Sequence, residues 1–128
     1  MKTIINMEQF RAANALADAE KIHRARGKEG DQLSGYHSLI ITNGLLATLA
    51  YSVDKGGECQ LIAQSLIGHL SNLQARKRFP GSPLPTDVMS AIRTISTTSE
   101  PTQLAMMSDE CLTYLNYLKR FVRAMNKL

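Results

Sequence analysis

The chain has 128 residues, which is the length of one compact domain spanning residues 1–128. Hydrophobic residues make up 44% of it, but only 5% are aromatic and none is Trp, which excludes an aromatic-rich β core and favours an aliphatic core built from helices. Fifteen Lys and Arg against eleven Asp and Glu leave a net charge of +4, which permits a polyanionic partner without requiring one.

The first residues, Met1 to Asn6, lack the apolar run of a secretory signal, and no later segment approaches the roughly 18 apolar residues that span a bilayer. We therefore expect a cytoplasmic protein with no membrane partner. Asn6 is placed to cap a first helix that ends near Arg26. The polar loop at 27–31 contains a Gly-Lys pair without the rest of a phosphate-binding loop, so no nucleotide site is expected there. The apolar stripe of this helix is predicted to hold Met7, Phe10, Ala13 and Ala17.

A second helix is predicted from about Leu33 to Val53, before a strong stop signal at 54–57. Gly44 then lies in mid-helix, at a cost of about 1 kcal/mol relative to Ala, and Asn43 lies on the core side, so both need a compensating reason. One interpretation is close helix packing with a buried Asn43 hydrogen bond; the other is close approach of another chain or an RNA backbone. The presumed core face holds Asn43 with Leu39, Leu46 and Ala50.

A third helix is predicted from about Glu58 to Arg78, ending at the proline-containing loop 79–83. A shorter fourth helix follows, capped by Thr86 or Asp87. The apolar face of the third helix is predicted to hold Cys59, Ile62, Ala63, Leu66, Ile67, Leu70 and Leu73. That of the fourth holds Val88, Met89, Ile92 and Ile95.

The last helix is predicted over about 101–126, with Ser99 as its cap and with a second cap and a break at 108–110. Its core stripe is predicted to hold Leu104, Met107, Cys111, Leu115, Leu118, Val122 and Met125. Beside this stripe lies an aromatic one, made of Tyr114, Tyr117 and Phe121. The predicted fold is therefore all-α, a single-domain bundle of about five helices.

Four cations of the last helix share the side that faces away from its core stripe. They come together there because an α-helix turns by about 100° per residue. We call them the basic arc: Lys119, Arg120, Arg123 and Lys127. The arc contains no compensating acid. A surface that binds phosphates and a solvated helix face next to a favourable C-terminal dipole explain it equally well at this level.

The residues that catalysis would need are dispersed. His23, His37 and His69 fall on different predicted elements, and none has an Arg five residues ahead of it, which removes the R-x-x-x-x-H arrangement of one helical RNase class. Asp109 and Glu110 are adjacent near a predicted helix start, where a capping and dipole role is expected. We expect no enzyme, although catalytic residues can still converge in space.

The two cysteines, Cys59 and Cys111, lie far apart and neither belongs to a C-x-x-C pair. We interpret them as small buried apolar residues rather than as a disulfide or a metal site. No cofactor is expected.

Two motifs carry a family resemblance. The first is Thr42-Asn43-Gly44-Leu45, followed by Leu49-Ala50-Tyr51; the second is Glu110-Cys111-Leu112 leading to Tyr117-Leu118-Lys119-Arg120-Phe121. In order and spacing the chain resembles the small-subunit family of Cmr-type (type III-B) CRISPR effector complexes. Tyr117 stands where that family usually has Trp, and the Pro that commonly precedes the isoleucine of the second helix is missing.

The resemblance implies a non-catalytic subunit that stacks in a few copies along a guide-RNA ribonucleoprotein and braces the strands through phosphate contacts that do not read sequence. The implied partners are the guide RNA, the target RNA, other Cmr subunits and copies of the chain itself. The candidate phosphate-binding residues are Arg11, Lys21, Arg24, Arg26, Arg76, Lys77, Arg78 and the basic arc, Lys119, Arg120, Arg123 and Lys127, which is preferred.

Two alternatives stay open. One is a helical adaptor without an RNA role, whose apolar surplus, including Ile41 and Leu45, binds a partner helix. It predicts association that is insensitive to salt. The other is a helical RNase that acts through dispersed residues, which predicts cleavage that depends on a divalent metal or on histidine.

Overall fold

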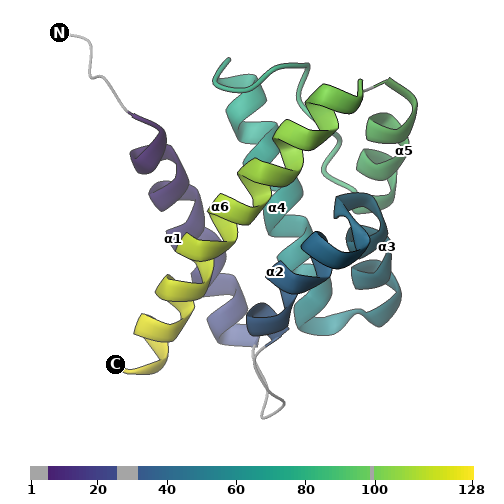
Figure 1. Ribbon diagram of the computed structural model, residues 1–128. Helices are drawn as coiled ribbons and strands as arrows, with labels where there is room; N and C mark the ends of the chain where they lie inside the picture. The colour runs from purple at the N-terminus through teal and green to yellow at the C-terminus, as the bar shows by residue number, and fades with distance from the viewer. Residues whose placement is uncertain (1–5, 26–31, 99) are drawn as a thin grey trace, which may run out of the picture.

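The computed structural model describes residues 6–25, 32–98 and 100–128, and within them the protein is all-α, without a strand (Figure 1). Six helices are present in this part of the chain, one more than predicted. They are α1 (Met7–Ala25), α2 (Gln32–Asn43), α3 (Leu45–Lys55), α4 (Gly57–Ala75), α5 (Val88–Thr98) and α6 (Pro101–Asn126). The predicted loop at 27–31 and the predicted cap Ser99 lie outside the described residues.

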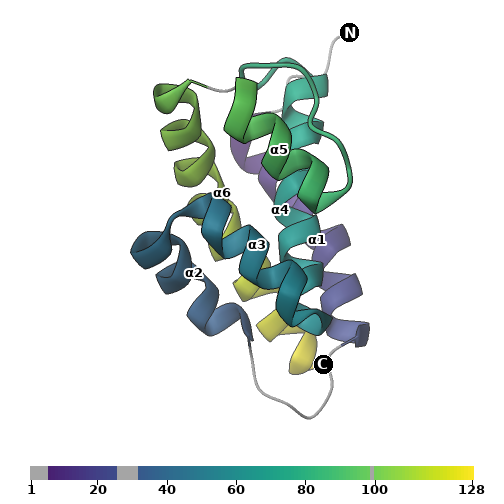
Figure 2. The ribbon, with the colours of Figure 1, turned by 90° about the vertical axis from the view of Figure 1, so that its right-hand side faces the viewer.

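Helix α4 lies at the centre of the bundle and contacts α1, α3, α5 and α6 (Figures 1 and 2). Its predicted apolar face is confirmed, because all seven residues assigned to it are buried. Ser65, His69 and Gln74 are buried on the same helix, so α4 is covered on most of its sides. The apolar core between the helices is largely aliphatic, as the low aromatic content predicts.

Helices α1 and α6 cross on one side of the bundle and make its most extensive helix pair (Figure 1). The predicted cap of α1 is confirmed: the Gln9 N–H donates to Asn6 Oδ1 at 2.9 Å, and the Asn6 N–H donates to Gln9 Oε1 at 3.0 Å, which makes a reciprocal capping box. The predicted stripe is only partly right, since Ala13 and Ala17 are exposed. The buried residues of α1 are Phe10, Ala15, Ala19 and Ile22.

The predicted second helix is interrupted at Gly44, which separates α2 from α3. Gly44 has φ 89° and ψ 160°, a conformation outside the helical region and essentially restricted to glycine. Because the chain turns here, α3 presents a different face from the one a continuous helix would, and Asn43 is exposed rather than buried. The predicted core face was therefore wrong. The residues that are buried are Leu33, Tyr36 and Ile40 on α2, and Leu45, Thr48, Leu49 and Ser52 on α3.

Side-chain hydrogen bonds join the two arms of this bend. The Tyr36 hydroxyl and Ser52 Oγ are 2.6 Å apart, and Ser52 Oγ also donates to the carbonyl of Thr48 at 2.8 Å. Thr48 Oγ1 in turn donates to the carbonyl of Gly44 at 2.8 Å. Burial raises the pKa of the Tyr36 phenol, so this group stays a neutral hydrogen-bonding partner.

Helix α4 ends at Ala75, earlier than predicted, and the basic residues 76–78 form a turn instead of a last helical turn. The loop after this turn leads into α5, whose cap is Asp87 rather than Thr86. The Ser90 N–H donates to Asp87 Oδ2 at 2.9 Å, and this backbone hydrogen bond lowers the pKa of the Asp87 carboxyl.

Helix α6 runs without interruption from Pro101 to Asn126, so the predicted break at 108–110 was wrong. Its N-cap is Glu100, with Pro101 in the first turn, where a missing N–H costs no helical hydrogen bond. Cys59 and Cys111 are both buried free thiols, as predicted, and burial raises the pKa of each. Among the described helices, none combines the length and the apolar character needed to cross a membrane.

Candidate nucleic-acid interface

The basic arc lies on the last turns of α6, where the positions 119, 120, 123 and 127 span roughly 100° of the helix circumference. Arg120, Arg123 and Lys127 are exposed, and Lys119 is half-buried. The guanidinium of Arg123 donates to Ser34 Oγ of α2 at 3.3 Å. Within the described residues, Lys119, Arg120 and Lys127 make no ion pair, so no carboxylate neutralises their charges.

Two hollows lie along α6 next to these cations. The first, which we call the arc hollow, has a volume of about 300 Å³ and is lined by Asn116, Lys119, Arg120 and Arg123. The second, which we call the α1–α6 groove, has a volume of about 460 Å³. Its lining residues are Glu8, Gln9, Ala12, Asn116, Tyr117, Arg120 and Phe121. The arc hollow is a pocket of amide and cationic groups, which is a surface that suits phosphate oxygens.

The candidate cations of α1 do not join the arc as one group. Lys21 is exposed, while Arg24 makes an exposed ion pair with Glu20 at 3.8 Å, a contact that contributes little. Arg11 is paired with Glu110 and is directed into the bundle, which removes it from the phosphate-binding candidates. Arg26 lies outside the described residues.

The cations of the turn after α4 gather beside the start of α1. The Arg76 and Arg78 guanidinium carbons lie 5.6 Å and 5.4 Å from the centroid of the Phe10 ring, so both cations interact with the same aromatic group. Both residues are exposed. They remain available to an anion on their outer sides, and they form a second cationic surface.

The family motifs occupy two different environments. In the first, Thr42 and Asn43 are exposed at the end of α2, Gly44 makes the bend and Leu45 is buried at the start of α3. The bend explains the glycine, and the interpretation with a buried Asn43 hydrogen bond was wrong because Asn43 is exposed. Close approach of another chain or an RNA backbone at Gly44 stays a prediction. The second motif extends over three surfaces of α6: Leu118 in the core, Tyr117 and Phe121 in the α1–α6 groove, and Lys119 and Arg120 on the basic arc.

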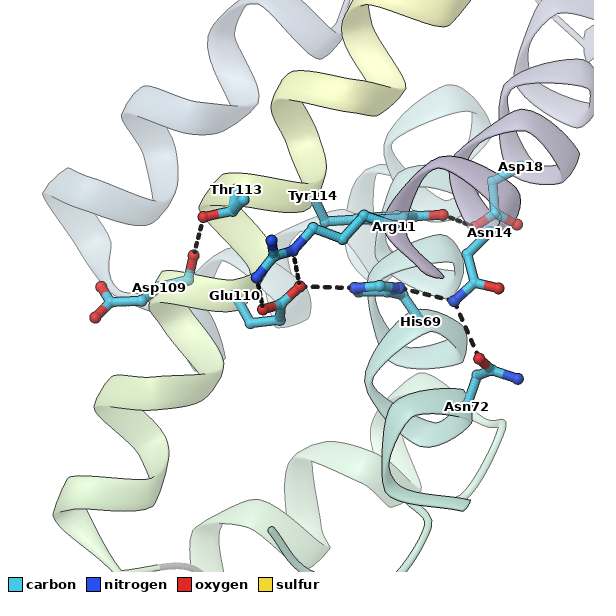
Figure 3. A network of polar contacts seen from close by, with 9 residues as sticks. All are labelled: Arg11, Asn14, Asp18, His69, Asn72, Asp109, Glu110, Thr113 and Tyr114. Carbon is cyan, nitrogen blue, oxygen red and sulfur yellow. Dashed lines mark hydrogen bonds and ion pairs between the residues drawn. The ribbon is translucent and has the colours of Figure 1, made fainter. Parts of the chain in front are cut away.

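A polar network that the sequence did not reveal joins α1, α4 and α6 inside the bundle (Figure 3). Arg11 Nε and Nη2 donate to the two carboxylate oxygens of Glu110, both at 2.8 Å, which makes a bidentate ion pair. His69 Nε2 lies 2.9 Å from Glu110 Oε2. Burial raises the pKa of Glu110, but the hydrogen bonds from Arg11 and His69 outweigh it and lower the pKa to about 2. Glu110 is therefore an anion held by two donors.

The His69 ring is held on both nitrogens and on its face. Since Glu110 can only accept, His69 Nε2 carries the proton, and Nδ1 accepts from Asn14 Nδ2 at 2.9 Å. Asn14 Nδ2 also donates to Asn72 Oδ1 at 3.2 Å. The Tyr114 ring stacks on the imidazole with centroids 3.9 Å apart. These contacts fix the orientation of the imidazole ring.

Tyr114 ends the network on the side of Asp18, to which its hydroxyl donates (Figure 3). Burial raises the pKa of the Asp18 carboxyl, while the Tyr114 hydrogen bond and the charge of Lys21 oppose that rise. Burial and the neighbouring Asp18 raise the pKa of the Tyr114 phenol. The phenol therefore stays a donor, and the pair ties the middle of α1 to α6.

This network is built for holding helices together rather than for chemistry on a substrate. His69 is 1% exposed and Glu110 is 7% exposed, and both His69 nitrogens already have partners. A substrate therefore has no open path to this acid–base pair. In the described part of the chain, no cluster of three His, Cys, Asp or Glu side chains could hold a metal ion.

Helical spacing places both Glu110 and His69 on the buried faces of their helices, and this pattern could have indicated the polar network. Glu110 lies three residues after Met107 and four before Tyr114, on the buried side of α6, and His69 lies three residues after Leu66 on α4. The assignment of Glu110 to a helix cap was wrong because α6 is continuous there. The sequence alone does not show that two polar residues on buried faces 41 positions apart meet each other.

Comparison with known proteins gives one match. A family model described as CRISPR-associated protein (Cas_Cmr5) matches residues 7–125, which is nearly the whole chain. No curated protein and no solved structure matches.

Proposed function

Because the chain belongs to the CRISPR-associated Cas_Cmr5 family, the small subunit of the type III-B Cmr complex, we propose that it lines the channel that holds guide and target RNA in that complex. In this role it contacts RNA phosphates without reading sequence, and it contacts other Cmr subunits and further copies of itself. The role is a structural one in antiviral defence, without catalysis, and it places the protein in the cytoplasm with its guide RNA.

The basic arc is the observation that carries this proposal. Cations and a side-chain amide line the arc hollow at the exposed end of α6, and no acid lines that hollow. Lys and Arg contacts to phosphate supply most of the affinity of sequence-independent RNA binding. Such contacts position a strand but do not distinguish its bases, which suits a subunit that has to accept any guide sequence.

A structural role agrees with the polar network. The one acid–base pair of this network, His69 with Glu110, is enclosed by α1, α4 and α6 and is satisfied by protein groups. The alternative role of a helical adaptor draws support from Ile41, which is 65% exposed, whereas Leu45 is buried and unavailable. In our proposal Ile41 belongs to a contact with a neighbouring subunit rather than to a separate adaptor function.

Reversing two charges of the arc tests the RNA contact. In the double variant Arg120→Glu and Arg123→Glu we expect RNA affinity to fall by about tenfold, or about 1.4 kcal/mol. The slope of log affinity against log salt should decrease by about 1.4, because a single strand releases roughly 0.7 counterions per phosphate contact. Helicity by circular dichroism should stay nearly unchanged, since both side chains are exposed. Titration of labelled RNA at several salt concentrations measures both quantities.

The matched control is Lys55→Glu with Arg93→Glu, which makes the same change in net charge on exposed residues of α3 and α5 that line neither the arc hollow nor the α1–α6 groove. It should retain the salt slope of the wild type. Incorporation into the complex is measured separately. If both double variants bind RNA like the wild type, the arc is a solvated helix face; if only assembly fails in the arc variant, the arc faces an acidic neighbouring subunit. Either result contradicts the proposal.

A further inference from the structure

Three hollows are adjacent, because each shares at least one lining residue with the next. The arc hollow and the α1–α6 groove share Asn116 and Arg120. The groove in turn shares Gln9 with a third hollow of about 250 Å³. This third hollow is lined by Gln9, Phe10, Ala13, Asn14, Asn72 and Arg76. We call these three adjacent hollows the trough; their lining residues extend from the basic arc to Arg76, the first residue of the turn after α4.

The middle of this trough has an aromatic wall. Tyr117 and Phe121 are half-buried, and their rings meet edge to face with centroids 6.3 Å apart. Arg11, which is fixed by Glu110, also interacts electrostatically with Tyr117. Aromatic rings beside cations are the surfaces on which unpaired bases stack, and a base in a duplex cannot reach such a ring.

Arg76, at the far end of the trough, begins a rigid cationic turn whose other two cations, Lys77 and Arg78, line a neighbouring hollow. The Arg78 N–H donates to the Leu73 carbonyl at 2.8 Å and the Lys77 N–H donates to the Gln74 carbonyl at 3.0 Å, the bonding pattern of a Schellman motif. The following loop is also held, since Gln74 and Gln103 both donate to the Pro80 carbonyl. The three cations 76–78 therefore project from a fixed backbone.

Lys77 occupies a position of this motif where glycine is usual. Its φ is 57°, and it is the only non-glycine residue with a positive φ in the part of the chain that the structure describes. A lysine is strained in this conformation, whereas glycine adopts it freely. Retention of a cation at the cost of strain is typical of a site where the charge has a function.

We propose that the trough binds one unpaired RNA strand, with phosphates on the basic arc and on the turn 76–78 and with bases against Tyr117 and Phe121. This inference rests on the proposed function and adds the path and the unpaired state of the strand. Glu8 is the acid of the trough and lies in its aromatic part. Its charge disfavours a phosphate there, which leaves that stretch to the bases, while the amides of Gln9 and Asn116 face base edges.

The turn is tested with Lys77→Gly. Relief of the positive φ should raise the melting temperature, while loss of the cation should lower the slope of log affinity against log salt by about 0.7 for a homopolymeric uridine RNA. Lys77→Gln removes the charge but keeps the strain, and it should lower the slope equally. Lys55→Gln is the matched control and should leave the slope unchanged. All variants are made in the full chain and checked by thermal melting.

The aromatic wall is tested with Tyr117→Trp, which introduces a unique fluorophore because the chain has no Trp. Unpaired uridine RNA should quench its emission, and the same length of duplex RNA should bind more weakly and quench it less.

If Lys77 variants bind like the wild type, or if duplex RNA quenches the Trp emission as strongly as unpaired RNA, the trough proposal is wrong. If the arc variant still loses RNA affinity, the proposed function survives that result. If wild-type protein binds no RNA, both proposals fail together.

Discussion

Replacing Glu110 by Gln lowers the free energy of unfolding by about 3 kcal/mol, the largest loss we expect from a single polar substitution in this protein. The neutral amide leaves the half-buried Arg11 guanidinium without its counter-charge and directs an N–H₂ or a weaker acceptor at the His69 Nε2–H. The three helices joined by the network lose their shared anion. Urea denaturation followed by circular dichroism measures the change.

Asp109→Asn is the matched control, because it removes the same charge from the neighbouring residue of the same helix. Asp109 is exposed, so its substitution should change stability by less than about 0.5 kcal/mol. A loss for Glu110→Gln no larger than that for Asp109→Asn would show that the ion pair with Arg11 is not formed in solution. A double-mutant cycle with Arg11→Met then gives the coupling energy of the pair.

The same carboxylate makes stability depend on pH in the acid range. Its pKa is lowered on folding from an ordinary value of 4.5 to about 2, so the stabilisation is present above about pH 4.5 and is lost as the pH falls toward 2. The difference in stability between wild type and Glu110→Gln should therefore shrink in that window. Asp18 acts in the opposite sense, because its raised pKa favours folding when protonated. Since Asp18 is present in both proteins, the comparison isolates Glu110.

Replacing Gly44 by Ala lowers the free energy of unfolding by about 1–3 kcal/mol, the second large effect we expect. A Cβ at this position meets nothing within 4 Å, so the loss comes from the backbone conformation at φ 89° and not from a clash. A continuous helix through this position would give the opposite sign, because Ala in a helix interior is more stable than Gly by about 1 kcal/mol.

Gly68 provides the matched control for Gly44. It lies inside α4 with helical dihedral angles, it is exposed, and a Cβ there also meets nothing within 4 Å. Gly68→Ala should therefore raise stability by about 0.5–1 kcal/mol. If both substitutions stabilise the protein, α2 and α3 form one helix in solution and the bend at Gly44 is absent.

How far the sequence predicted this molecule depends on whether a feature is local. The apolar stripes of the third and last predicted helices were right because the spacing of apolar residues such as Leu66, Leu70 and Leu118 follows the period of a helix directly. The basic arc followed from the same spacing. The bend at Gly44 was missed, since a glycine inside an apolar pattern is compatible with a helix and only tertiary packing decides between the two states.

The groove and the polar network depend on which helices become neighbours. Tyr117 and Phe121 were recognised as a stripe, but only the crossing of α1 over α6 turns that stripe into the wall of a groove. The sequence indicated no partner for His69, because its partners Glu110 and Asn14 come from two other helices. Charged and polar residues are assigned to the surface by default, and this preference hides buried pairs.

The directional hydrogen bonds of the polar network also fix the position of α6 along α1. A slip of α6 past α1 by one helical turn would be a movement of about 5.4 Å. Such a slip would separate Glu110 from Arg11 and His69 at once. The offset between the cations of α6 and those that follow α4 is thereby fixed, and in the proposed stack of copies each one would present its cations at the same spacing.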